Sequence, residues 1–174
     1  MLRPKTFQLS SLCFGLFLLF IFFCYACSFN PAVQSRGEGY LQGEWQQDSL
    51  YTGKQLVSYS LSNIKFSCDS FYITVNTVSN INYGADSCMK HGRWTEYIRG
   101  KYSQKKDTLH LKGFFYNANG TFKTVNDCFR AGVYEDFFKV QVLSDSLIQL
   151  SVNPATIPMN MRLVNQAVCV PKPL

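Results

Sequence analysis

Residues 98–115, IRGKYSQKKDTLHLKGFF, indicate the fold class most directly. Their side chains alternate in character from Ile98 to Gln104 and again from Leu109 to Phe115, which is the period of a strand with one buried face. Between the two runs lies Lys106-Asp107-Thr108-Leu109, where an Asp followed by a hydroxyl residue favours a turn by hydrogen-bonding its own backbone. The stretch therefore predicts a β-hairpin.

The same turn chemistry recurs at a fixed spacing. Asp69, Asp107 and Asp145 lie 38 residues apart, and the outer two belong to Cys68-Asp69-Ser70-Phe71 and Ser144-Asp145-Ser146-Leu147. Each turn lies between alternating runs, which predicts a meander of repeated hairpins. With one more strand at each end of the meander, the expected strands cover residues 40–47, 62–68, 70–78, 93–104, 107–116, 133–143, 145–152 and 158–165.

An even number of up-and-down strands lets the first and last pair and close a barrel, which leaves no exposed edge. We therefore predict an all-β domain, a single up-and-down antiparallel β-barrel of about eight strands, preceded by a helical signal segment. On this path the three Asp turns lie at one end of the barrel, together with Cys169. The loops 79–92 and 117–132 lie at the other end.

Four cysteines follow residue 27, an even number without C-x-x-C spacing. In an oxidising compartment this arrangement is most simply two disulfides. The barrel path pairs Cys68 with Cys169 and Cys88 with Cys128. The alternative is a soft-metal site in Cys88-Met89-Lys90-His91, but four residues rarely form a site alone and no further ligand can be named, so no metal is expected.

Asn119-Gly120 leaves one alternative topology open. This dipeptide is a strong signal for a type I′ hairpin turn. It could make residues 121–125 a ninth strand, which would reverse the direction of the later strands and with it the expected disulfide pairing.

Residues 1–26 have the pattern of a secretory signal peptide. Arg3 and Lys5 precede a stretch with no charged residue from Thr6 to Ser35, and its centre is almost wholly apolar. An uncleaved signal anchor is the alternative, because about 20 uncharged residues can span a bilayer. The two cations keep the N-terminus cytoplasmic in either case, so the body of the protein is expected outside the cytoplasmic membrane.

Cys24-Tyr25-Ala26-Cys27 resembles the lipobox of bacterial lipoproteins, in which a small residue precedes a Cys that is acylated, for example with palmitate, and becomes the new N-terminus. The resemblance implies a lipid on Cys27, a lipid-anchored tether over residues 27–39 and a barrel domain over residues 40–174. It also implies a location in the bacterial cell envelope, extracytoplasmic and held to the inner or outer membrane.

The number and distribution of charged residues bear on whether the protein binds nucleic acid. The formal net charge of +6 becomes +4 without Arg3 and Lys5, since all 11 acidic residues lie after residue 30. Lys105-Lys106 is the only adjacent basic pair, and no basic stripe is interleaved with aromatic residues. Nucleic acid is therefore not an expected partner.

Gly43-Glu44-Trp45 resembles the Gly-x-Trp motif with which lipocalins and lipocalin-like barrels open. In those barrels the Trp plugs the closed end, and an Arg near the last strand packs across it. The resemblance to lipocalin-like bacterial lipoproteins therefore assigns Trp45 to the plug and Arg162 to the cation–π contact. Similar chains are sometimes labelled fumarate hydratase, but this chain lacks the Gly-Ser-Ser-x-Met-Pro catalytic loop of that enzyme.

The expected function is the binding or carriage of a small apolar or amphipathic ligand between the strands. The candidate lining is aromatic and near the open end: Trp94, Tyr83, Phe115 and Tyr134. The alternative interpretation is that these rings fill the core of the barrel and contact no ligand. The alternative function is a non-catalytic envelope module that binds a protein partner, whose identity the sequence does not indicate.

Catalysis is the least favoured function, and no catalytic residue or cofactor is expected. His91 and His110 show no pairing with a nucleophile, and His110 alternates with leucines, which places it toward solvent. Glu135-Asp136 is an acidic pair, but neighbours in an extended strand point to opposite faces and cannot share one substrate.

Overall fold

The computed structural model describes residues 33–48, 56–81, 88–125, 127–152 and 157–173. The chain divides into two compact units, of which the larger is Gln34–Lys172. In the smaller unit only Val33 and Pro173 are described, and they form an isolated antiparallel bridge. The expected signal peptide and Cys27 lie outside the described residues. Within the described ranges, no helix has the length and apolar character needed to cross a membrane.

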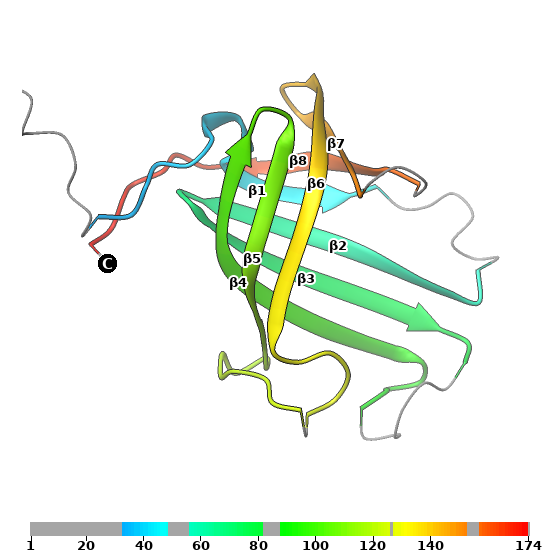
Figure 1. The fold of residues 1–174 in the computed structure, drawn as a ribbon. Coiled ribbons are helices and arrows are strands. Elements are labelled where there is room, and N and C mark those ends of the chain that lie inside the picture. The colour runs from blue at the N-terminus through cyan, green and yellow to red at the C-terminus, as the bar shows by residue number, and fades with distance from the viewer. Residues whose placement is uncertain (1–32, 49–55, 82–87, 126, 153–156, 174) are drawn as a thin grey trace, which may run out of the picture. The chain divides into compact units, whose positions relative to one another are not determined.

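The larger unit is a closed up-and-down barrel of antiparallel strands, as predicted (Figure 1). Consecutive strands pair with one another, and the last strand pairs with the first. The strands are β1 (Gly43–Gln47), β2 (Ser58–Ser67), β3 (Ser70–Ser79), β4 (Arg93–Lys105), β5 (Thr108–Tyr116), β6 (Val133–Ser144), β7 (Leu147–Ser151) and β8 (Met159–Gln166).

Most strand boundaries lie within two residues of the predicted ones, but β2 begins at Ser58, four residues earlier than predicted. The first strand begins at Gly43 instead of residue 40, because Gly39–Leu41 form a 3-10 turn, η1, that buries Leu41 completely. The compact unit also begins before the expected domain boundary at residue 40. Gln34 donates from its side chain to Ser70 Oγ at 2.8 Å, so residues that were expected in the tether contact the barrel.

Asn119-Gly120 does not add a ninth strand to the described barrel. The backbone of Asn117 bonds to Thr121 at 2.9 Å, and Tyr116 and Phe122 form a single isolated bridge. The small turn folds back on β5 and leaves the direction of the later strands unchanged. Both disulfides therefore form as predicted, Cys68–Cys169 and Cys88–Cys128.

The first two Asp turns each contact the strand that comes after their own hairpin, which is β4 for the first turn and β6 for the second. The Asp69 carbonyl accepts the Tyr102 N–H at 2.8 Å, and its carboxylate pairs with Lys101 at 3.4 Å. Asp107 makes the same two contacts 38 residues later. Its carbonyl accepts the Val140 N–H at 2.7 Å, and its carboxylate pairs with Lys139 at 3.5 Å. The 38-residue period of the sequence is therefore also a period of the contacts between hairpins.

The turn conformation itself comes from the residue before each of these aspartates. Cys68 and Lys106 have positive φ angles of 54° and 57°. Such angles are uncommon for residues other than glycine, and tight hairpins require them. The turns thus form through the backbone of the preceding residue, in addition to the Asp chemistry that identified them.

The end that carries the Asp turns is called the closed end, because apolar side chains fill it. Trp45 is 1% exposed, and its indole N–H donates to the Leu41 carbonyl at 2.7 Å. The Gln42 side chain bonds both backbone groups of Cys68, at 2.7 and 3.0 Å. The remaining fully buried side chains of this layer are Phe66, Phe71, Ile64, Leu109, Leu111, Ile148, Leu150 and Met161.

A pair of glycines shapes the middle of the barrel. Gly100 and Gly113 lie opposite each other on β4 and β5, and a Cβ on either would meet the other strand's backbone at 2.1–2.2 Å. On the flanking strands, Phe71 of β3 lies opposite Gly100, and Tyr134 of β6 lies opposite Gly113. The ring centroids of Phe71 and Tyr134 are 6.1 Å apart. The two rings therefore lie on either side of the space that the glycines leave.

The predicted packing of Arg162 across Trp45 is wrong. Arg162 lies opposite Gln46 on the outer face, and its half-exposed side chain pairs with Asp48 at 3.3 Å. The reason is the alternation of β8, in which Met161 is buried and its neighbour must point outward. Gly43 of the same motif does have a specific role, since its φ is +137° and a Cβ would lie 2.3 Å from the Asn165 carbonyl.

Candidate functional site

The opposite end of the barrel, here called the open end, carries the described residues of the loops 80–92 and 117–132 (Figure 1). The Cys88–Cys128 disulfide joins these two loops, with a Cα–Cα distance of 5.5 Å. The sequence predicted both the position of the loops and their cross-link. Polar and aromatic side chains gather around this end, on the inner and on the outer face of the barrel.

The inner face of β2 changes character toward the open end. Ile64 is buried in the core, and the next inward-facing positions are Ser62, Ser60 and Ser58. On β3, the inward-facing Thr77 bonds to Ser60 at 2.7 Å between hydroxyl oxygens. The inner wall made by β2 and β3 is thus apolar in its closed half and rich in hydroxyl groups in its open half.

Glu96 is a carboxylate on the inner face of β4, with a side chain only 4% exposed. Arg130, from the loop 117–132, binds it through Nε at 3.1 Å and Nη2 at 2.9 Å, and also donates its backbone N–H at 3.3 Å. The hydrogen bond with Glu96 raises the pKa of Arg130 above its usual value. The guanidinium also lies 5.2 Å from the centroid of the Phe115 ring, so Arg130 attaches the loop to the barrel wall.

This ion pair leads to a stability prediction. Arg130→Ala leaves the buried Glu96 carboxylate without its cation, and we expect a loss of about 1–3 kcal/mol in the free energy of unfolding. The double variant Glu96→Gln/Arg130→Ala removes the uncompensated charge and is expected to be more stable than Arg130→Ala. Urea denaturation measures both. Equal stability of the two variants would show that the carboxylate does not depend on Arg130.

Tyr134 and Asp136 extend the polar part of the inner face on β6. Burial raises the pKa of the Tyr134 hydroxyl well above its usual value, and the charge of Asp136 and a hydrogen bond with it raise that pKa further. The phenol therefore remains protonated over the whole physiological pH range. Asp136 faces inward and Glu135 outward, as the alternation predicted, so the two carboxylates do not share a site.

The residues predicted to line a ligand site lie in different surroundings. Phe115 is 5% exposed and belongs to the core cluster, and the partly buried Tyr134 packs edge-on against it. Trp94 lies nearer the open end and stacks on Phe129, with ring centroids 4.4 Å apart. Tyr83 lies outside the described residues.

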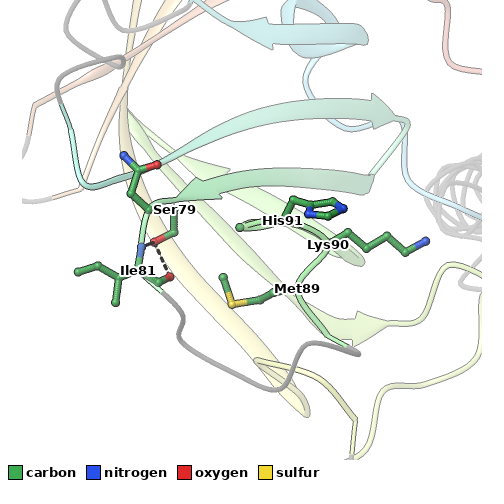
Figure 2. Close-up of a pocket in the computed structure, with 7 residues that line it drawn as sticks. Ser79, Ile81, Met89, Lys90 and His91 are labelled. Carbon is green, nitrogen blue, oxygen red and sulfur yellow. Dashed lines mark hydrogen bonds between the residues drawn. The ribbon is translucent and has the colours of Figure 1, made fainter.

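A hollow of about 760 Å³ lies beside the end of β3, and we call it the mouth hollow. Its described lining consists of residues 79–81 and 89–92. Figure 2 shows the Met89 side chain directed toward Ile81, while Lys90 extends away from it. Ser79 is both the last inward-facing residue of β3 and part of this lining, so the hollow adjoins the inner face.

A second hollow of about 720 Å³ lies on the outer face, and we call it the outer groove. Outward-facing residues of β3, β4 and β5 line it on one side: Asn76, Val78, Arg93, Thr95, Tyr97 and Tyr116. Residues of the two cross-linked loops line the other: Lys90, Asn117, Lys123 and Asp127, with both cysteines of the disulfide. The inward-facing Thr77 and Trp94 and the loop residue Phe129 also line the groove.

Sequence reasoning missed most of these residues. Glu96 had a usable signal, because it is a charged residue in the inward register of β4, between Trp94 and Ile98. Arg130 and Phe129 had none, since their partners lie on a strand more than 30 residues away. The outer groove likewise depends on how the loops fold back over the strands.

The residues that were considered for catalysis or metal binding do not come together in one site. His110 lies on the outer face, where it stacks on Phe137 and bonds Glu135 at 2.8 Å, and this bond lowers the pKa of Glu135. Cys88 is in a disulfide and offers no thiolate. Among the described residues, no three His, Cys, Asp or Glu side chains are grouped to hold a metal ion.

Comparison with known protein families, curated proteins and solved structures found no match.

Proposed function

We propose that this protein is an extracytoplasmic lipoprotein, anchored to the membrane through Cys27, whose barrel binds a small amphipathic molecule at its open end. The observation that carries the proposal is the change along the inner face. The closed half is filled by side chains such as Trp45 and Phe66, whereas the open half presents Ser60 and Ser62 and adjoins the mouth hollow.

The chemistry of the open half supports an amphipathic ligand. Met89 offers apolar surface in the mouth hollow, and the hydroxyl groups of Ser60, Thr77 and Ser79 offer hydrogen bonds. Small-molecule sites combine such surfaces and usually measure about 300–1,000 Å³. The 760 Å³ of the mouth hollow falls within that range.

The position of Gln34 supports an orientation for the anchored protein. Its side chain bonds the β2–β3 turn at the closed end, at 2.8 Å from Ser70 Oγ. Six residues lie between it and Cys27, and the seven residue steps of an extended chain span at most about 25 Å. An anchor on Cys27 would therefore hold the closed end toward the membrane and leave the open end accessible.

Native mass spectrometry of the protein isolated from its own membrane tests the ligand. We expect a bound small molecule of constant mass, and Ser60→Trp, which fills the open half from the inner face, is expected to abolish it. Ser103→Trp is the matched control, because Ser103 is an exposed serine on the outer face of β4. Retention of the molecule in Ser60→Trp, or its absence from the wild type, would overturn the proposal.

The alternative function is a protein-interaction module, and one outer surface favours it. Phe114, Phe122 and Phe137 are 44%, 61% and 54% exposed on or beside β5 and β6. Clusters of exposed aromatic side chains are typical of interfaces. The same mass-spectrometry experiment separates the two functions, since a stable protein partner in place of a small molecule favours this one.

A further inference from the structure

The outer groove has an excess of positive charge that the described residues do not neutralise. Lys90, Arg93 and Lys123 line it, and within the described ranges none of them forms an ion pair. Its one described carboxylate, Asp127, is engaged by hydrogen bonds from the N–H and hydroxyl of Thr124, at 2.6 and 3.1 Å, which lower its pKa. Counting three cations and one carboxylate, the described lining carries a charge of +2.

The wall of the groove also carries polar and aromatic side chains, which suit a ligand that contains a hydroxylated ring. Asn76 and Thr95 lie opposite each other on β3 and β4, both exposed and joined by a hydrogen bond of 2.9 Å. Tyr97 and Tyr116 form the next cross-strand pair. Arg99 lies 3.6 Å over the Tyr116 ring, whereas within the described residues no ring or cation stacks on Tyr97.

From these features we infer that the outer groove binds an acidic oligosaccharide. The C–H face of a sugar ring packs on the aromatic ring of Tyr97, and the amides and hydroxyl of Asn76, Asn117 and Thr95 bond the sugar hydroxyls. Carboxylate groups on successive sugars pair with Arg93 and Lys123. The groove is an open hollow of about 720 Å³, large enough for more than a single inorganic anion.

An acidic peptide is the less suitable occupant. Extended peptides commonly bind by adding a strand to an exposed sheet edge. The barrel is closed, because β8 pairs with β1, so it offers no edge beside the groove. Recognition must come from side chains alone, and the polar and aromatic lining matches a carbohydrate.

This site is centred on a different face of the barrel wall from the one proposed inside the barrel. Most strand residues of the groove face outward, while the proposed ligand of the barrel occupies the inner face. Lys90 contributes to both hollows, and the inward-facing Thr77 and Trp94 also line the groove, so these three residues are left unchanged in the test. Ser60→Trp is expected to leave saccharide binding intact, which distinguishes failure of one proposal from failure of the other.

The test is isothermal titration calorimetry of the full-length protein with tetragalacturonate. We expect the variant Arg93→Gln/Lys123→Gln to weaken binding about five- to tenfold, because two exposed charge pairs are lost. Tyr97→Ala is expected to weaken it as well, and added salt should reduce the wild-type affinity. Arg36→Gln/Lys105→Gln is the matched control, since it removes one Arg and one Lys, both exposed and without an ion pair, away from the groove.

Three comparison ligands each test a different explanation of binding in the groove. A neutral tetrasaccharide that binds as tightly would overturn the role of the cations, and free phosphate that binds as tightly would reduce the groove to a simple anion site. A tetraglutamate peptide with equal affinity would overturn recognition of a sugar. Absence of binding, or equal weakening by the control variant, also contradicts the inference.

Discussion

Removal of the Cys68–Cys169 disulfide, as Cys68→Ala/Cys169→Ala, is expected to lower the free energy of unfolding by about 4–5 kcal/mol. The two cysteines are 101 residues apart, and a cross-link that closes a loop of this length greatly restricts the unfolded chain. A loss of this size is a large fraction of the stability of an ordinary domain, which is about 5–15 kcal/mol. Urea denaturation under non-reducing conditions measures it.

The second disulfide provides the control for this prediction. Cys88 and Cys128 are 40 residues apart, so the same argument gives a smaller stabilisation, about 4 kcal/mol. The Cys68 side chain is also 1% exposed, so its truncation removes buried contacts and adds to the loss at the closed end. Equal stability of the wild type and Cys68→Ala/Cys169→Ala would contradict the expectation, as would a larger loss in Cys88→Ala/Cys128→Ala.

Trp45→Ala is expected to reduce the free energy of unfolding by about 3–5 kcal/mol, the usual loss when a large buried aromatic residue is truncated. Trp45 is 1% exposed at the closed end, and its indole N–H bonds the Leu41 carbonyl at 2.7 Å. Truncation therefore opens a cavity and leaves a buried carbonyl without its donor. Thermal or urea unfolding followed by circular dichroism avoids dependence on tryptophan fluorescence.

Trp94→Ala is the matched control, because the chain has only two tryptophans. Trp94 is partly exposed at the open end and stacks on a loop residue, Phe129. Its truncation removes less buried surface, so a smaller loss is expected. Similar losses in the two variants would show that Trp45 does not plug the barrel.

The fold could be predicted from local patterns because its contacts follow the order of the chain. Alternation identifies strands, the Asp turns join them into hairpins, and in an up-and-down barrel each strand pairs with its neighbour in sequence. Because consecutive strands of such a barrel alternate in direction, the place of a strand in the sequence order determines its direction. This is why the pairing of Cys68 with Cys169 and of Cys88 with Cys128 was correct.

The candidate site was less predictable for two different reasons. The position of Arg162 was misjudged by following a resemblance, although the alternation of Met161 and Leu163 in its own strand already indicates an outward side chain. Phe115 and Tyr134 were placed on the correct, inner face, but alternation does not tell whether a ring meets a ligand or another ring. Their packing against each other became visible only in three dimensions.

The sequence by itself determined the all-β barrel, its two ends and its cross-links, because a period of two residues and a regular turn are local properties of the chain. Only the tertiary structure decided that Arg130 binds Glu96 and that the cross-linked loops form a groove over Tyr97. Those contacts join residues that no periodicity relates. Their geometry depends on how loops without regular structure pack against the completed barrel.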